Sequence, residues 1–403
     1  MQASQTAPSP DVQQLIDEGY VVSIEGSYLI VDSVPYVPAA RTIGRGALIC
    51  AYAHQNGVPQ LNGDHTVWFT GSAPCQADGS SLDNALVADK TAQTIAGRQV
   101  LCRLSNKPEN LEQMLASFYN KLTHYIRKLT SHARVIDPTA SASGTGSFAY
   151  RQKPSVFFYP NPAIARSGLD AYDAKLVVGK VAIVGLGGTG SYILDALAKM
   201  PVQEIHLYDH DVVDPGSAYR SPGAMTIEQA HGNVKKTDHF RDLYSAMRTG
   251  IASHPVRVDE ANVHELNDCA FVFIAIDNGP SRGVIARHLT GRAIPFIDVG
   301  IGVDKVTESV QLLGRARVTL IESDTAHLVD KLPVADDQDD AVYNNVQVVE
   351  LNAMNAMLAV VRYKQLLGFY ADETKAMSLK YISSWSRLVV QARGDAESPT
   401  HQA

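Results

Sequence analysis

The second half of the chain alternates short apolar runs with segments whose apolar residues recur at helical spacing. The predicted strands are 180–185, 204–208, 271–276 and 294–297, and the predicted helices are 189–200 and 345–368. Alternation of strands and helices is typical of a parallel sheet covered by helices. The pattern therefore predicts an α/β fold, a Rossmann-like, mostly parallel sheet with flanking helices, in a C-terminal domain spanning 151–393.

The first half has a different pattern, with short alternating runs at 19–24, 27–31 and 65–70 that predict strands. Residues 111–129 place apolar side chains at helical spacing and predict one long amphipathic helix. We expect a small α+β domain of unknown role over 1–136. The remaining segments are 137–150, whose small residues predict a flexible linker, and 394–403, a polar tail predicted to be disordered.

Composition narrows the class of protein. The 403 residues are 45% hydrophobic and 19% charged, which fits a globular protein with room for two domains. A net charge of −7 argues against a general nucleic-acid binder. No apolar run is long enough to span a membrane, and the start of the sequence lacks the pattern of a signal peptide. Four cysteines without a CxxC pair indicate a reducing compartment, so we expect a cytoplasmic protein.

A glycine-rich turn carries the first chemical signal. Gly185, Gly187, Gly188 and Gly190 follow a predicted strand and open a predicted helix, as in dinucleotide- and nucleotide-binding α/β proteins. Such glycines allow a tight turn, a close approach of phosphate and close packing of the helix. The helix N-terminus offers unpaired N–H groups to that phosphate. Asp209 ends the next strand, where an acid binds ribose hydroxyls, so the turn predicts a nucleotide site.

The residues that follow separate two kinds of nucleotide. Arg220, Lys235 and Asp277 follow Asp209 along the chain, and Asp277 comes at the end of a predicted strand. Residues just beyond the carboxyl ends of strands point into the ligand crevice, so we expect Asp209, Asp277 and the glycine turn to converge on one site. Two cations and an added carboxylate suit ATP with Mg²⁺ better than a dinucleotide. An NAD(P)-dependent oxidoreductase is the alternative, and it explains the glycine turn and Asp209 but gives those three residues no role.

The order of these motifs resembles the ThiF/MoeB and ubiquitin-activating enzyme superfamily over about 160–370. It is most similar to ThiF-type proteins of bacterial ubiquitin-like conjugation operons, which serve antiviral defence and carry an extra N-terminal domain. The resemblance implies ATP-dependent adenylation of a carboxyl terminus, with the C-terminal glycine of a ubiquitin-like protein as the leading substrate. It also implies a homodimer and a downstream conjugating enzyme as a partner. A small-molecule carboxylate as substrate, and a catalytically silent scaffold of the same family, remain alternatives.

The resemblance also assigns roles to individual residues. It gives catalytic roles to Arg220 and Lys235, which neutralise phosphate, and to Asp277, which holds Mg²⁺. Arg166 is the candidate for an added arginine near the domain start. Ser217 stands where relatives have asparagine, three residues before the arginine. The residues expected to bind nucleotide are the four glycines with Asp209, Asp211, Ser217 and Asn278, and Arg282 lies on the same segment as Asn278.

The chain lacks one feature of many relatives, a cysteine that receives the activated carboxyl group. No cysteine occurs in 315–345, and Cys269 precedes an apolar strand, where a buried thiol is expected. Any covalent intermediate is therefore predicted to be an oxyester, with Thr319, Ser323 and Thr325 as the candidate hydroxyls.

Overall fold

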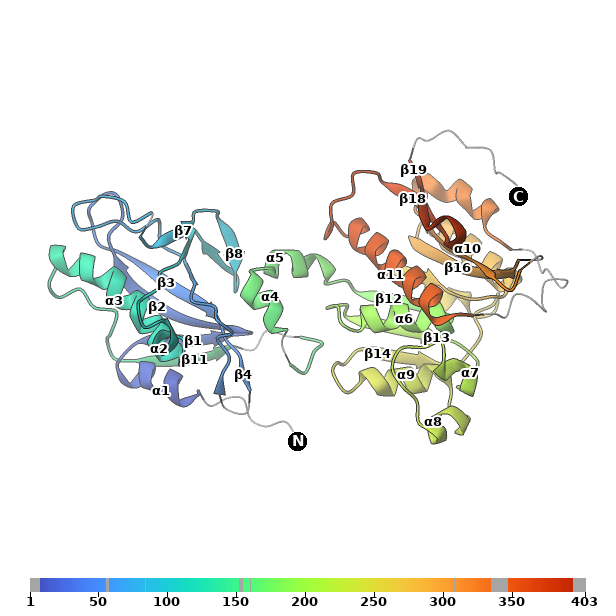
Figure 1. Cartoon of the computed structure of the whole chain (residues 1–403), viewed down its shortest axis with the longest axis horizontal. Helices are drawn as coiled ribbons and strands as arrows, with labels where there is room; N and C mark the ends of the chain where they lie inside the picture. Colours follow the sequence, from blue (N-terminus) through green and yellow to red (C-terminus); the bar gives the residue numbers. More distant parts are fainter. Residues whose placement is uncertain are drawn as a thin grey trace. The chain divides into compact units, whose positions relative to one another are not determined.

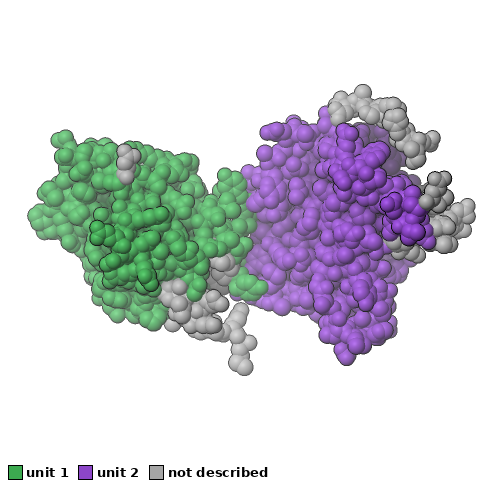
Figure 2. Space-filling model, viewed as in Figure 1, with its two compact units in different colours: residues 1–155, 159–173 green, residues 156–158, 174–403 purple. Residues whose placement is uncertain are grey.

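The computed structural model describes residues 8–55, 58–83, 85–151, 155–159, 161–306, 309–334 and 347–393. The chain divides into two compact units (Figure 2). Unit 1 comprises residues 1–155 and 159–173, and unit 2 comprises residues 156–158 and 174–403. Among the described helices, none combines the length and the apolar character needed to cross a bilayer.

Unit 1 is built on a seven-stranded sheet with the order β11-β1-β2-β3-β6-β10-β7. Its strands are β1 (Val21–Glu25), β2 (Tyr28–Tyr36), β3 (Gly44–Ala51), β6 (Val67–Phe69), β7 (Val87–Asp89), β10 (Cys102–Leu104) and β11 (Ser147–Arg151), with the two-stranded ribbons β4 (His54–Gln55)–β5 (Val58–Pro59) and β8 (Gln93–Ile95)–β9 (Arg98–Val100). Its helices are α1 (Pro10–Asp17), α2 (Leu111–Met114), α3 (Phe118–Ile136), α4 (Pro162–Ser167) and α5 (Asp170–Asp173).

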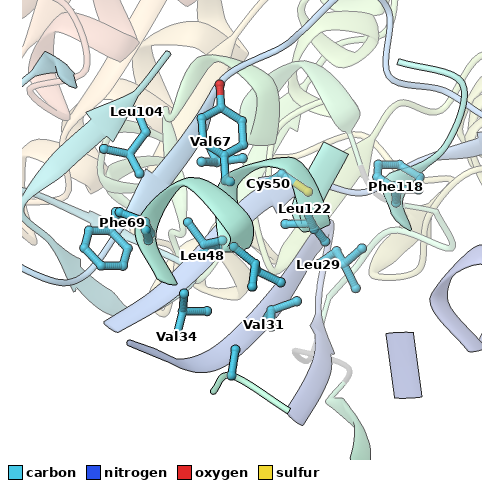
Figure 3. Packing of buried hydrophobic residues seen from close by; sticks show 14 of the residues in the cluster. Leu29, Val31, Val34, Leu48, Cys50, Val67, Phe69, Leu104, Phe118 and Leu122 are labelled. Atoms are coloured by element: carbon cyan, nitrogen blue, oxygen red, sulfur yellow. The ribbon is translucent and has the colours of Figure 1, made fainter. Parts of the chain in front are cut away.

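The long helix predicted at 111–129 is two helices, because Ser117 interrupts it. Its hydroxyl accepts a hydrogen bond from the Asn120 N–H at 3.0 Å and caps the start of α3. The apolar face of α3 then packs on the sheet, where Leu122 meets Leu29 and Leu48 in one buried cluster (Figure 3). Helical spacing alone found the buried face but not the break within it.

The prediction of a flexible linker at 137–150 is wrong. Ala140 and Ala142 are buried, and β11 pairs in parallel with β1 from Val21↔Ser147 to Glu25↔Arg151. The small residues serve close packing instead of flexibility: a Cβ on Gly146 would lie 2.6 Å from the carbonyl oxygen of Ile16. The two units therefore divide later than predicted, near residue 173. The tail 394–403 lies outside the described residues.

Unit 2 contains an eight-stranded sheet with the order β14-β13-β12-β15-β16-β17-β18-β19. Several of its strands and helices are labelled in Figure 1. The strands are β12 (Lys180–Val184), β13 (Glu204–Tyr208), β14 (Ile251–His254), β15 (Phe271–Ile274), β16 (Phe296–Lys305), β17 (Leu312–Ile321), β18 (Ala376–Ile382) and β19 (Arg387–Ala392). The α-helices are α6 (Gly188–Leu197), α7 (Pro215–Ala218), α8 (Ile227–His231), α9 (Lys236–Tyr244), α10 (Gly279–Gly291) and α11 (Val349–Leu366); the 3₁₀ segments are η1 (Ala174–Leu176), η2 (Val263–Leu266), η3 (Ser323–Lys331) and η5 (Ser383–Trp385).

The predicted α/β fold is confirmed, with an extension that the sequence did not reveal. Strands β14 to β16 pair in parallel, whereas β16 to β19 pair antiparallel. The residues of β12 alternate between the two faces of the sheet. Ile183 packs toward α6 and α11, and Val184 packs toward α10, so helices cover both faces of the parallel half. The turn after β12 is thereby held between two apolar layers.

Candidate nucleotide site

The glycine turn joins β12 directly to α6. Gly185 has φ +95°, and a Cβ there would lie 2.5 Å from the carbonyl oxygen of Ala275. A Cβ on Gly190 would lie 1.9 Å from the carbonyl oxygen of Gly185, so the first turn of α6 packs directly against the end of β12. At Gly187, the N-cap of α6, a Cβ would meet no atom within 4 Å. The turn is closed on the sheet side and open where a phosphate would approach.

Asp209 fastens this turn to the end of β13. One carboxylate oxygen accepts a hydrogen bond from the Leu186 N–H at 2.6 Å, and the other accepts one from the Asp211 N–H at 2.8 Å. Its side chain is almost fully buried. Asp209, which the sequence predicts to bind the nucleotide, therefore also fixes the geometry of the turn, because both of its carboxylate oxygens accept hydrogen bonds from backbone N–H groups.

A cavity of about 570 Å³ opens over the carboxyl ends of the strands. Most of the predicted site residues line it: Gly185, Gly187, Gly188, Asp209, Asp211, Arg220, Asp277 and Asn278, together with Arg282. Gly190, Ser217 and Lys235 do not line it. Arg166 lies exposed on α4 of unit 1, so its catalytic role stays a prediction.

Arg220 provides a direct test of whether the cavity suits an anion. Its side chain is partly buried in the cavity wall, and its Nε has no hydrogen-bond partner among the described residues. A buried donor without a partner costs about 1–3 kcal/mol, and more when the group is charged. A phosphate in the cavity would give this guanidinium an anionic partner, so the residue fits the predicted ligand.

Two neighbouring lysines lie at this end of the cavity, although the sequence predicts a role for Lys235 alone. Lys235 is half-buried, and its Nζ donates to the carbonyl oxygen of His210 at the edge of the cavity. Lys236 lines the cavity, is nearly buried, and donates to Asp211. Burial works to raise the pKa of Asp211, but the hydrogen bond and charge of Lys236 outweigh it and lower that pKa. The structure places Lys236 in the cavity wall, the position that the sequence predicts for Lys235.

Two polar residues predicted to contact nucleotide serve as helix caps. Ser217 donates its N–H to Asp214 at 2.6 Å in a capping box on α7 and is buried away from the cavity. Asn278 accepts the Ser281 N–H at 2.9 Å and caps α10, although it also lines the cavity. Capping explains both residues locally, and the role of Ser217 as a nucleotide ligand has no support in this arrangement.

Asp277 fits the predicted role of a metal ligand. It is exposed in the cavity wall at the end of β15 and forms no hydrogen bond or ion pair with the described residues. Another group of possible metal ligands is formed by Asp209, His210 and Asp211, whose ligand atoms lie within 4.8 Å of one another. Asp209 and Asp211 already accept N–H and ammonium donors, which leaves Asp277 as the carboxylate best able to hold Mg²⁺.

A buried carboxylate that the sequence analysis missed organises the floor of the cavity. Asp298 is fully buried, and it accepts from Arg282 Nε at 2.9 Å and from an Arg317 guanidinium nitrogen at 2.6 Å. Arg282 also donates to the carbonyl oxygens of Ile276 and Pro333, so it braces three segments. A single acid within an apolar strand is the signal that could have identified this group, because a buried charge requires a partner.

The cysteines are buried and unpaired, as predicted for Cys269. Burial raises the pKa of Cys50 to about 11 and that of Cys102 and Cys269 to about 12. None of the four lines the described cavity.

The candidate hydroxyls for an oxyester do not line this cavity either. Thr319 and Thr325 are buried and hydrogen-bonded to Arg317 and to backbone groups, whereas Ser323 is exposed at the start of η3. An oxyester on any of them stays a prediction.

The glycine turn between β12 and α6 and the cavity lined by arginines and lysines are typical of a nucleotide-binding α/β protein. Residues 162–389 match the ThiF family, and the chain belongs to that family. The match confirms the predicted family. Residues 10–162 match a domain of unknown function, DUF6791, which agrees with a separate N-terminal unit.

Individual relatives resemble only part of the chain. The SAMP-activating enzyme E1 of Haloferax volcanii is 28% identical over 126 residues, which are 30% of this chain and 46% of that enzyme. The chain thus matches less than half the length of this relative. Among solved structures, E. coli MccB with ATP is 16% identical with a TM-score of 0.45, covering 60% of this chain and 69% of MccB. PaaA is 17% identical with a TM-score of 0.42, covering 55% and 75%.

Proposed function

We propose that the chain adenylates a carboxyl terminus with ATP and releases pyrophosphate. The observation that carries the proposal is the unpartnered, buried Nε of Arg220 in the same cavity as the open N-terminus of α6. A helix N-terminus and a guanidinium that lacks an anion are together suited to a polyphosphate. Membership of the ThiF family supports the same reaction.

The cavity supplies the charges that this reaction needs. A carboxylate that attacks the α-phosphate meets like-charge repulsion, and cations near the reacting oxygens reduce it. Arg220 and Lys236 line the cavity, and Lys235 lies at its edge. When bound at Asp277, Mg²⁺ would supply further charge neutralisation for the phosphates. Asp209 would hold the ribose while it keeps the glycine turn in place.

The finer substrate is proposed from the relatives. The name of the Haloferax volcanii protein, a SAMP-activating enzyme E1, supports a ubiquitin-like protein with a C-terminal glycine as the substrate. A downstream conjugating enzyme, a role in bacterial antiviral defence and a cytoplasmic location belong to the same proposal.

A homodimer through unit 2 is also proposed. On α11 the side chains of Val349, Met357 and Val361 stay about 40% exposed, so part of this helix remains available for contact with a second copy. A monomer by light scattering at micromolar concentration would sink this part of the proposal.

The test combines nucleotide binding with turnover. We expect wild-type protein to bind ATP with Mg²⁺ by calorimetry and not NADH, and to catalyse ATP–pyrophosphate exchange with a ubiquitin-like protein. Arg220→Ala and Asp277→Ala should each lower exchange at least about a hundredfold, the scale of one lost electrostatic contact in the transition state. Arg287→Ala, on the exposed side of α10 and away from the cavity, serves as the matched control. Tight NADH binding without ATP binding would instead favour the oxidoreductase.

A further inference from the structure

The cavity extends beyond the nucleotide end onto the antiparallel half of the sheet. Gly300 and Gly302 of β16, Arg315 and Arg317 of β17, and Lys380 of β18 line this part. Directly paired residues of antiparallel strands point to the same face, and the register pairs Gly300 with Arg317 and Gly302 with Arg315. These side chains therefore share one face, which we call the cationic face. Val299, Ala316 and Val318 turn to the opposite face and are buried.

The cations of the cationic face differ in whether they have an acidic partner. Arg317 is paired with Asp298 at 2.6 Å, and Arg315 is paired with Asp304. Lys380 forms no ion pair with any described residue, and it lies directly opposite Arg317 in the register. Cross-strand partners have their Cβ atoms about 5 Å apart, and like charges in this position destabilise a sheet. An anionic group bound beside Lys380 would offset that repulsion.

The glycines of β16 leave room for such a group. A Cβ on Gly302 would meet no atom within 4 Å, and a Cβ on Gly300 would lie 3.2 Å from the guanidinium of Arg317. Larger residues at these positions would fill the space over the strand or push Arg317 from Asp298. The face is thus bare over β16 and charged over β17 and β18, a shape suited to a thin, extended chain.

We propose that the cationic face binds the last residues of the carboxyl substrate, and that this segment carries an acidic side chain that pairs with Lys380. The inference rests on the proposed adenylation, in which a carboxyl terminus reaches a nucleotide at the glycine turn, and the cationic face lines the rest of the same cavity. It adds a specificity that adenylation does not require: the substrate tail is acidic, not basic.

The test measures binding separately from turnover. Fluorescein-labelled peptides of sequence Ala-Xaa-Ala-Xaa-Ala-Gly-Gly, with Glu, Gln or Lys at Xaa, are titrated with the full chain and a nonhydrolysable ATP analogue. We expect the Glu peptide to bind about five- to tenfold more tightly than the Lys peptide, the scale of one partly exposed charge contact and its reversal. Lys380→Glu should reverse that order, and Lys380→Gln should remove it.

Lys199→Glu is the control, because it makes the same change of charge on an exposed lysine outside the cavity. It should keep the wild-type order. Equal binding of the three peptides, no binding at all, or the wild-type order retained in Lys380→Glu would overturn the inference. A loss of ATP affinity in Lys380→Glu with the peptide order unchanged would assign Lys380 to the nucleotide and also overturn it.

Pyrophosphate release with ATP and each peptide separates this inference from the proposed function. If the Glu peptide binds more tightly than the Lys peptide but no pyrophosphate is released, the result contradicts adenylation and still supports binding of an acidic segment to the cationic face. Release that is the same for all three peptides would support adenylation and contradict the acidic tail.

Discussion

Lys236 donates a hydrogen bond from Nζ to a carboxylate oxygen of Asp211 at 2.8 Å, and both residues line the nucleotide cavity. The preceding residue, Lys235, is the N-cap of α9 and directs its ammonium group to the carbonyl oxygen of His210. Successive residues at a helix start point in different directions, so one position separates a lysine in the cavity wall from one at its edge.

The first prediction follows from this pair. Lys236→Ala should lower ATP–pyrophosphate exchange about a hundredfold, because it removes a nearly buried cation from the cavity. Lys235→Ala should lower exchange about tenfold or less. Lys199→Ala is the control on the surface. A larger loss in Lys235→Ala than in Lys236→Ala would show that Lys235 moves to the phosphate when ATP binds, as the sequence analysis predicted.

The second prediction concerns the glycine turn. Gly190→Ala should destabilise unit 2 by about 1–3 kcal/mol or more and abolish ATP binding, because its Cβ would lie 1.9 Å from a backbone oxygen of the turn. Gly179→Ala, where a Cβ meets nothing within 4 Å, is the matched control. Thermal unfolding and calorimetry measure the two effects. Wild-type stability and ATP affinity in Gly190→Ala would contradict the observed packing of α6 on β12.

The sequence was sufficient to place the centre of the site because its geometry is local. Gly185, Gly190 and Asp209 are fixed by one strand–turn–helix–strand unit, so their spacing predicts their positions. Lys236 and Asp298 were missed for different physical reasons. The choice between two adjacent lysines depends on the residue at which α9 begins, and the partners of Asp298 come from α10 and β17, which no local pattern connects.

The fold, like the site, is predictable where a local sequence pattern determines an element and not where distant contacts determine it. The parallel strands β12 and β15 are almost entirely buried and apolar, and their sequences predict them, whereas the partly exposed edge strand β14 gives no such run and is not predicted. Strand β17 has arginines on one face and buried residues on the other, and β18 places Lys380 on the same cationic face, so neither gives a continuous apolar run. The small residues around Ala140 were misread because composition cannot distinguish a flexible segment from one packed against a neighbouring strand.

The third prediction concerns the cysteines. With the pKa of Cys50 raised to about 11 and those of Cys102 and Cys269 to about 12, only about one Cys50 thiol in a thousand is ionised at pH 8. The thiols of folded protein should therefore react slowly with iodoacetamide at pH 8 and quickly after unfolding in urea.

The same burial has a consequence for transfer. A variant with all four cysteines replaced by alanine should keep ATP–pyrophosphate exchange, provided that circular dichroism shows it folded. Any covalent adduct with the substrate should survive thiol reductant and be cleaved by hydroxylamine. An adduct that disappears on reduction would show that a cysteine becomes accessible during the reaction and would refute the oxyester.

The last prediction concerns two histidines at the edge of the parallel sheet. His206 Nδ1 and His254 Nε2 lie 2.9 Å apart, and the ring of His254 stacks on Tyr208 at 4.3 Å between ring centres. Burial is the largest cause that lowers the pKa of both histidines. Glu204, 3.2 Å from His206, and Glu265, 3.9 Å from His254, act in the opposite direction without reversing the shift.

The sign of the pH effect follows from these shifts. A histidine in the unfolded chain has a pKa of about 6.5. Below that pH the unfolded chain binds protons at both histidines, whereas in the folded chain both histidines are still neutral until the pH reaches their lowered pKa values. Stability should therefore fall as the pH drops from about 6.5 toward the lowered folded pKa values, where the loss is complete. The Asp209 N–H donates to the carbonyl oxygen of His254. A destabilised β14 should therefore also disturb Asp209, at the nucleotide end of β13.

His206→Gln tests this account, since glutamine can occupy the strand position without gaining a charge. The fall in melting temperature between pH 7.5 and 5.5 should be smaller in His206→Gln than in wild type, and ATP affinity should vary less over the same range. His231→Gln, at the exposed end of α8, is the matched control and should behave as wild type. If His206→Gln and wild type lose the same stability on acidification, other groups carry the pH dependence and the pair does not.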